Sequence, residues 1–217
     1  MCGIVSYVGH LDPTPILLKG LKRLEYRGYD SAGIALLDKN NLYHIKRAGK
    51  VSDLLRQVNP SLAKGNLGIA HTRWATHGVP NDINAHPHLD QTGKIALVHN
   101  GIIENYEAVK KTLIGRGVSF TSDTDTEVLV QLISELYYNN DKKLNFEDAV
   151  KAALQEVVGA YGIVVLCADE PDTMVAARMG SPLVLGVGEG EFLIASDASP
   201  IIEYTRNVIY LDDDEFV

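Results

Sequence analysis

Cysteine is scarce in this sequence, because Cys2 and Cys167 are the only two among 217 residues. Two cysteines cannot build a disulfide framework, and free thiols persist in a reducing compartment. The amino terminus also lacks a positively charged region ahead of a signal-like apolar core. We therefore expect a cytoplasmic protein in which the two thiols need separate explanations.

The sequence also lacks a net positive charge and long apolar runs. The 20 Lys and Arg residues against 28 Asp and Glu give a formal net charge of -8, and the basic residues are scattered along the chain. Phosphate binding needs a basic patch, so nucleic acid is not an expected partner. No apolar run approaches the roughly 20 residues that a membrane-spanning helix needs, so we expect no membrane contact.

Apolar residues are nevertheless numerous enough for one substantial core. A chain of 217 residues with 46% hydrophobic content would be crowded as two folding units. The sequence therefore predicts a single domain over residues 1–217. Its last six residues form an acidic turn followed by the start of another strand, so we expect this domain to be part of a longer protein.

The predicted elements run in the order strands, helices, strands. Strands are predicted at residues 2–8, 31–37, 42–47, 67–71 and 95–99, and again at 162–167, 173–178, 183–187, 191–195 and 208–211. Helices are predicted at residues 15–24, 106–116, 126–138 and 146–157, the last capped by Asn145. Residues 72–94 form a long polar stretch, predicted to be a functional or disordered loop. Since sheets and helices must each cover an apolar face, the order predicts an α+β fold, a four-layer αββα sandwich.

Cys2 is the first candidate for chemistry. Removal of Met1 ahead of this small residue would leave a thiol and a free amine on one residue. An α-amine titrates near 7.7 to 8.0 and a Cys thiol near 8.5, so a minor neutral fraction of the amine can generate thiolate without a histidine. The alternative is that Cys2 is a small hydrophobic residue at the start of a buried strand.

Two further segments offer groups that suit an amide substrate. Asn100 and Gly101 follow a strand, and a side-chain amide beside a backbone N–H can stabilise a developing oxyanion. The same dipeptide is also a strong signal for a type I′ turn. Arg73 could grip a carboxylate with two parallel bonds, or form a surface salt bridge. Asp125 precedes a predicted helix and could cap it or bind an ammonium, and Asp123 offers the same choices.

Histidines raise a rival hypothesis. His71, His77, His86, His88 and His99 are close together in the sequence, which would suit a metal site. No Cys pair or helical His-Glu motif accompanies them, so we expect hydrogen-bonding histidines and no metal. The glycines of residues 186–190 lack the Lys-Ser or Lys-Thr of a phosphate loop and predict a hairpin, and we expect no cofactor.

Several segments, taken together, resemble the class II glutamine amidotransferases. They are Cys2–Val5, Leu24–Ser31, Arg73–Gly78, the Asn100-Gly101 pair and Thr124–Glu127. The resemblance spans the whole chain and is closest to the branch whose ammonia aminates a sugar phosphate. It implies the sandwich of the N-terminal-nucleophile hydrolases and hydrolysis of L-glutamine to glutamate and ammonia.

The resemblance also implies a role for each matching residue. Cys2 is the expected nucleophile, and the Asn100 amide and the Gly101 N–H form the expected oxyanion hole. Arg73 is expected to bind the carboxylate of glutamine, and Asp125 its ammonium. Three more residues are expected near the substrate: Thr76 and His77 on a closing loop, and Trp74 as the gate for ammonia.

Further partners follow from the same resemblance. Sugar-phosphate isomerase domains of the same polypeptide are expected to use the ammonia to convert fructose 6-phosphate to glucosamine 6-phosphate, and the full-length enzyme is expected to be a homodimer. Two alternatives stay open at this point. One is the glutaminase domain of another class II enzyme, such as an amidophosphoribosyltransferase, and the other is a non-catalytic domain that only binds glutamine.

Overall fold

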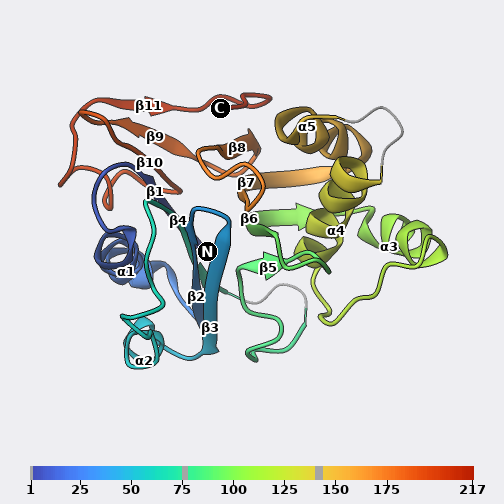
Figure 1. Ribbon diagram of the computed structural model, residues 1–217, viewed down its shortest axis with the longest axis horizontal. Helices are drawn as coiled ribbons and strands as arrows, with labels where there is room; N and C mark the ends of the chain where they lie inside the picture. The colour runs from blue at the N-terminus through green and yellow to red at the C-terminus, as the bar shows by residue number, and fades with distance from the viewer. Residues whose placement is uncertain (1, 75–77, 140–143) are drawn as a thin grey trace.

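A computed structural model describes residues 2–74, 78–139 and 144–217. Two antiparallel sheets lie face to face between two groups of helices, as Figure 1 shows from left to right. The first sheet has the order β11 (Val208–Tyr210), β9 (Val184–Val187), β10 (Phe192–Ala195), β1 (Gly3–Val8), β4 (Leu67–Arg73), β2 (Ser31–Asp38) and β3 (Asn41–Ala48). The second has the order β5 (His88–Leu89), β6 (Ile95–Ile103), β7 (Gly159–Cys167) and β8 (Met174–Met179).

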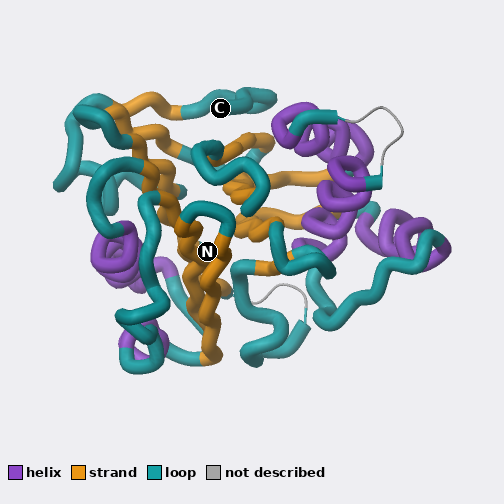
Figure 2. Tube along the Cα trace, in the orientation of Figure 1, coloured by secondary structure: helices purple, strands orange, loops and turns teal. Residues whose placement is uncertain are grey.

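The helices form the two outer layers (Figure 2). The first sheet is covered by α1 (Pro13–Leu24) and α2 (Val51–Leu55), with the 3-10 turn η1 (Glu25–Arg27) after α1. The second sheet is covered by α3 (Tyr106–Gly115), α4 (Asp125–Tyr138) and α5 (Phe146–Glu156). The predicted four-layer αββα sandwich is therefore confirmed.

Three apolar interfaces hold the four layers together. Leu17 and Leu21 of α1 pack on Val5 and Tyr7 of the first sheet. Between the sheets, side chains such as Ile4, Ile69, Val98 and Val164 form a second buried cluster. The third cluster joins the outer face of the second sheet to α4 and α5 through Leu129, Ile133, Val150 and Val165. Burial of apolar surface in these clusters is the main stabilising term of the fold.

Capping side chains fix the starts of α4 and α5. The Asn145 side chain accepts from the N–H of Asp148 at 2.7 Å, so the predicted cap of α5 is confirmed. The α4 helix is capped by Thr124, which accepts from the N–H of Glu127, so Asp125 is the first helical residue and not the cap. The predicted start at residue 126 was one residue late.

Other boundaries differ more. The strand predicted to end at His99 continues to Ile103, and the one predicted to start at Gly162 begins at Gly159. The predicted start of the long loop, residue 72, was two residues early, because Thr72 and Arg73 still belong to β4. The segment predicted as loop also contains the short strand β5. Helix α2 was missed because five residues are too short for a helical period to show. Among the described residues, no helix combines the length and the apolar character needed to cross a bilayer.

The topology brings distant residues to one place. Strand β1 lies between β10 and β4, and the pairing of Gly3 with Thr72 puts the start of β1 beside the end of β4. Strand β6 of the second sheet packs against both, so its later residues approach the start of β1. Residues 2, 73 and 100 meet there although up to 98 positions separate them in sequence.

Candidate active site

The Cys2 thiol is half-buried, and Cys2 directly precedes the first residue of β1. Its Sγ accepts from the backbone N–H of Trp74 at 3.2 Å and lies 3.5 Å from the Trp74 carbonyl oxygen, to which the S–H can donate. Burial raises the pKa of the Cys2 thiol above its ordinary value, while the Trp74 N–H and the charge of Arg73 lower it to a smaller extent. The thiol is therefore protonated at neutral pH and needs a base to become a nucleophile.

Asn100 and Gly101 lie within β6 and do not form a turn. They pair with Gly162 and Tyr161 of β7, so the type I′ turn considered from the sequence is wrong. Gly101 has a φ of 131°, and a Cβ at this position would lie 2.0 Å from the carbonyl oxygen of Ala160, so no side chain fits. The Asn100 Nδ2 donates to the carbonyl oxygen of Cys2 at 3.4 Å. The Asn100 amide thus contacts Cys2, and Gly101, the next residue, lines the pocket that contains the Cys2 thiol.

Arg73, the last residue of β4, is only 3% exposed. Its Nη2 donates to the carbonyl oxygen of Gly78 at 3.1 Å, and Nη1 lies 3.5 Å from that of Val79 and 3.9 Å from a carboxylate oxygen of Asp30. A surface salt bridge is therefore the wrong description of this residue. The guanidinium is held in place by backbone carbonyls and lines the same pocket as Cys2.

The structure separates the two candidate aspartates. Asp125 is buried, and its Oδ2 accepts from the backbone N–H of Ile103 at 2.8 Å. Asp123 is exposed and exchanges hydrogen bonds with the side chain of Asn84. Of these two aspartates, only Asp125 lines the pocket that contains Cys2 and Arg73, so the geometry favours Asp125 over Asp123 as the candidate.

Cys2, Arg73, Gly101 and Asp125 share one narrow pocket of about 20 Å³. Its lining consists of Cys2, Arg73, Trp74, His86, His99, Gly101, Thr124, Asp125 and Thr126. Trp74 is 54% exposed, and its ring packs over Gly28. Thr76 and His77, which were also predicted at this site, lie outside the described residues.

Four buried histidines, His71, His86, His88 and His99, form a histidine layer at the pocket, and His86 and His99 line it directly. The Thr126 hydroxyl lies 2.9 Å from the Nε2 of His86 and 3.0 Å from the Nδ1 of His99. Burial, more than any neighbouring charge, lowers the pKa of His86 and His88 well below the ordinary value. Within the described part of the chain, no group of three or more His, Cys, Asp or Glu residues has metal-site geometry. The pocket roles of His86, His99 and Thr126 were missed, because only the topology brings them to Cys2.

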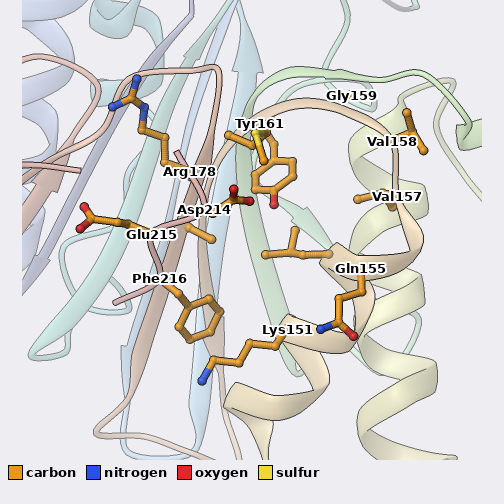
Figure 3. Close-up of a pocket in the computed structure, with 13 residues that line it drawn as sticks. Lys151, Gln155, Val157, Val158, Gly159, Tyr161, Arg178, Asp214, Glu215 and Phe216 are labelled. Carbon is orange, nitrogen blue, oxygen red and sulfur yellow. The ribbon is translucent and has the colours of Figure 1, made fainter. Parts of the chain in front are cut away.

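Larger hollows lie elsewhere on the described part of the chain, and two of them exceed 500 Å³. A cavity of about 580 Å³ lies between α5, the start of β7, β8 and the last residues of the chain, with Lys151, Tyr161 and Phe216 in its wall (Figure 3). Its described lining includes no Cys, Ser, Thr or His side chain. A hollow of about 960 Å³ lies between β3 and α4. Among these three, only the narrow pocket is lined by a thiol together with a guanidinium and a carboxylate, those of Cys2, Arg73 and Asp125.

Comparisons with known proteins agree with this geometry. Residues 71–203 match the family model described as glutamine amidotransferase domain. The chain is 56% identical over 218 residues to the glutamine–fructose-6-phosphate aminotransferase (isomerizing) of Chlorobaculum tepidum, and 55% identical over 216 residues to that of Bacteroides thetaiotaomicron. Each alignment covers 99% of this chain and 35% of the relative, so the chain spans about a third of the length of these proteins.

Among solved structures, the glutamine phosphoribosylpyrophosphate amidotransferase of B. subtilis superposes with a TM-score of 0.80 at 26% identity. The superposition covers 100% of this chain and 48% of that one. The two aminotransferases share about twice as high a sequence identity with this chain as the phosphoribosylpyrophosphate amidotransferase does. The chain is therefore more similar in sequence to the aminotransferases.

Proposed function

Since this chain belongs to the glutamine amidotransferase family and corresponds to the glutamine-hydrolysing part of its relatives, we propose that the thiol of Cys2 carries out that hydrolysis. The observation that carries the proposal is the single pocket that joins Cys2, Arg73, Gly101 and Asp125. Glutamine has a carboxamide, a carboxylate and an ammonium. The pocket offers a nucleophile with oxyanion donors, a guanidinium and a carboxylate to match them.

The first half of the reaction forms a thioester. After removal of Met1, the neutral α-amine of Cys2 takes the Sγ proton, and the thiolate attacks the carboxamide carbon of glutamine. The carbonyl oxygen becomes an oxyanion, which the Asn100 Nδ2–H and the Gly101 N–H stabilise. The C–N bond then breaks, the amine returns the proton to the leaving nitrogen, and ammonia departs. Because burial raises the pKa of the thiol, the amine base is required for this step.

The second half consumes water. A water molecule, deprotonated by the same amine, attacks the thioester carbon, and the same two donors stabilise the second oxyanion. The C–S bond breaks, the thiolate recovers its proton from the amine, and glutamate leaves. Arg73 and Asp125 hold the carboxylate and the ammonium of the amino acid throughout, at atoms that do not react.

Asn100→Ala is expected to lower kcat about 10²- to 10³-fold, because loss of one oxyanion donor removes about 2.7 to 4 kcal/mol of transition-state stabilisation in a comparable hydrolase. Asn100→Asp should be similarly slow, since it keeps one side-chain oxygen but replaces the donor NH2 with an acceptor. The measurement is the steady-state rate of ammonia release. Asn207→Ala, an exposed position, is the matched control. Near-normal turnover in Asn100→Ala would remove Asn100 from this role.

Arg73→Ala is expected to act mainly on affinity. Charge-assisted bonds to a carboxylate contribute about 1.5 to 3 kcal/mol, so KM for glutamine should rise roughly 10- to 150-fold. The carboxylate is remote from the reacting carbon, so kcat should change far less. Arg56→Ala, at an exposed arginine, controls for the loss of charge. An unchanged KM in Arg73→Ala would contradict the assignment.

The wider context also belongs to the proposal. The names of the relatives and their greater length support a longer polypeptide, in which residues 1–217 form a single glutaminase domain and sugar-phosphate isomerase domains use its ammonia to convert fructose 6-phosphate to glucosamine 6-phosphate. In that enzyme Trp74 gates the exit of ammonia, and Thr76 and His77 close over glutamine. We further propose that the full-length enzyme is a cytoplasmic homodimer.

A further inference from the structure

His71 links the two sheets directly behind the oxyanion donors. It lies on β4 of the first sheet and is fully buried. Its Nε2 lies 3.1 Å from the carbonyl oxygen of His99 and 3.0 Å from the Oδ1 of Asn100, both on β6 of the second sheet. One ring nitrogen therefore contacts a backbone acceptor and the side-chain amide of Asn100 at the same time.

The contact with the His99 carbonyl fixes which nitrogen of His71 carries the proton. A carbonyl oxygen only accepts, so Nε2 must be the protonated nitrogen that donates. Burial is the largest cause that lowers the pKa of His71, to about 3, so the ring is neutral at working pH and carries one N–H. The Nδ1 has no hydrogen-bond partner among the described residues, and the ring packs against that of His86 with centroids 4.2 Å apart.

The Nε2–H in turn fixes the rotation of the Asn100 amide. An N–H that points at an amide must meet its oxygen, because the NH2 group would place donor against donor. With Oδ1 facing His71, the NH2 group faces the other way, toward Cys2, where Nδ2 donates to the Cys2 carbonyl oxygen at 3.4 Å. Without the Nε2–H, Oδ1 would face the carbonyl oxygen of His99 with no proton between them. The amide would gain by turning its NH2 group to that carbonyl, and the oxyanion donor would be lost.

We propose that His71 is a positioning residue that sets the rotation of the Asn100 side-chain amide so that its NH2 group points at the reacting carbonyl oxygen. The inference rests on the proposed function, because it assumes that Asn100 stabilises the oxyanion. It assigns His71 no contact with substrate. The histidine acts through Asn100 alone.

His71→Leu and His71→Gln test the idea, with ammonia release as the readout. His71→Leu removes the donor and should lower kcat about tenfold to a hundredfold, with KM for glutamine within about threefold of the parent, because the lost interaction exists only in the transition state. His71→Gln can return an N–H near the Nε2 position and should recover most of that loss. The exposed His10→Leu is the matched control and should keep the parent rate.

A double-mutant cycle separates this inference from the proposed function. In the Asn100→Ala background, His71→Leu should change kcat by no more than about twofold, because the group that it positions is gone. If Asn100→Ala alone keeps normal turnover, the proposed oxyanion role is wrong. If Asn100→Ala is slow and the effect of His71→Leu simply adds to it, or appears in KM, the positioning role is overturned.

If His71→Leu does not fold, the proposal can still be tested by measuring the tautomer of His71. The tautomer of His71 in the unsubstituted chain can be read from imidazole ¹⁵N chemical shifts. We expect the neutral Nε2–H tautomer from pH 8 to pH 5. An Nδ1–H tautomer or a charged ring in this range would overturn the proposal.

Discussion

Cys2→Ala is expected to abolish hydrolysis of glutamine, with kcat falling by a factor on the order of 10⁴ to 10⁶, as when the nucleophile of a comparable hydrolase is removed. Without the thiol no thioester can form, and the remaining donors have no attacking atom to assist. The measurement is ammonia release by the processed chain at saturating glutamine. Glutamine binding, followed by a thermal shift, should persist because Arg73 and Asp125 are unchanged.

Cys167→Ala is the matched control for this experiment. Cys167 is fully buried at the end of β7, and burial raises the pKa of its thiol, so it is inert toward substrate. This variant should keep the parent kcat even where the small cavity lowers stability. Retention of the original rate in Cys2→Ala would contradict the account, as would loss of activity confined to Cys167→Ala.

Acid is expected to destabilise the fold steeply through its buried histidines. His71, His86 and His88 have pKa values far below the ordinary value near 6.5, with burial as the main cause in each. In the unfolded chain they titrate near 6.5, so below that pH the unfolded state binds protons that the folded state does not. Their stabilising effect is therefore complete above pH 6.5. This stabilisation is lost as the pH falls toward the pKa values that the histidines have in the folded protein. For His71 that pKa is about 3.

The magnitude follows from linkage. Together the three histidines should lower the free energy of unfolding by roughly a few kcal/mol between pH 7.5 and 5.5, out of the 5 to 15 kcal/mol typical of a domain. Urea denaturation across this range measures the loss. His88→Gln, whose amide can still meet the Thr124 hydroxyl, should reduce the loss by about a third. The exposed His10→Gln should leave it unchanged. A loss below about 1 kcal/mol in the parent chain would contradict the prediction.

The layered fold was predictable because apolar periods and turn residues report local structure. The order of strands and helices led to the αββα sandwich, and the family prediction is confirmed by the match over residues 71–203. Boundaries were less accurate where tertiary pairing overrides local signals. The Asn100-Gly101 pair has strong turn propensity, yet both residues are held in β6 by pairing with β7.

The site was predictable only in part. Cys2, Arg73, Asn100 and Asp125 could be selected because each carries a group that matches part of glutamine, although their roles remain predictions. The histidine layer could not be selected in the same way. His71 and Asn100 lie on different sheets, and nothing in their sequence spacing indicates that a ring nitrogen of one meets the amide of the other. Contacts of this kind depend on how the two sheets pack.

Covalent labelling tests the central claim, that the thiol of the processed chain's first residue attacks the carboxamide of bound glutamine. The processed chain is incubated with an electrophilic glutamine mimic, and the modified peptide is mapped by mass spectrometry while ammonia release is followed. We predict one adduct per chain, on Cys2 and not on Cys167, which forms in step with loss of activity and is prevented by excess glutamine. An adduct at another residue, or ammonia release that continues after complete modification of Cys2, would contradict the claim.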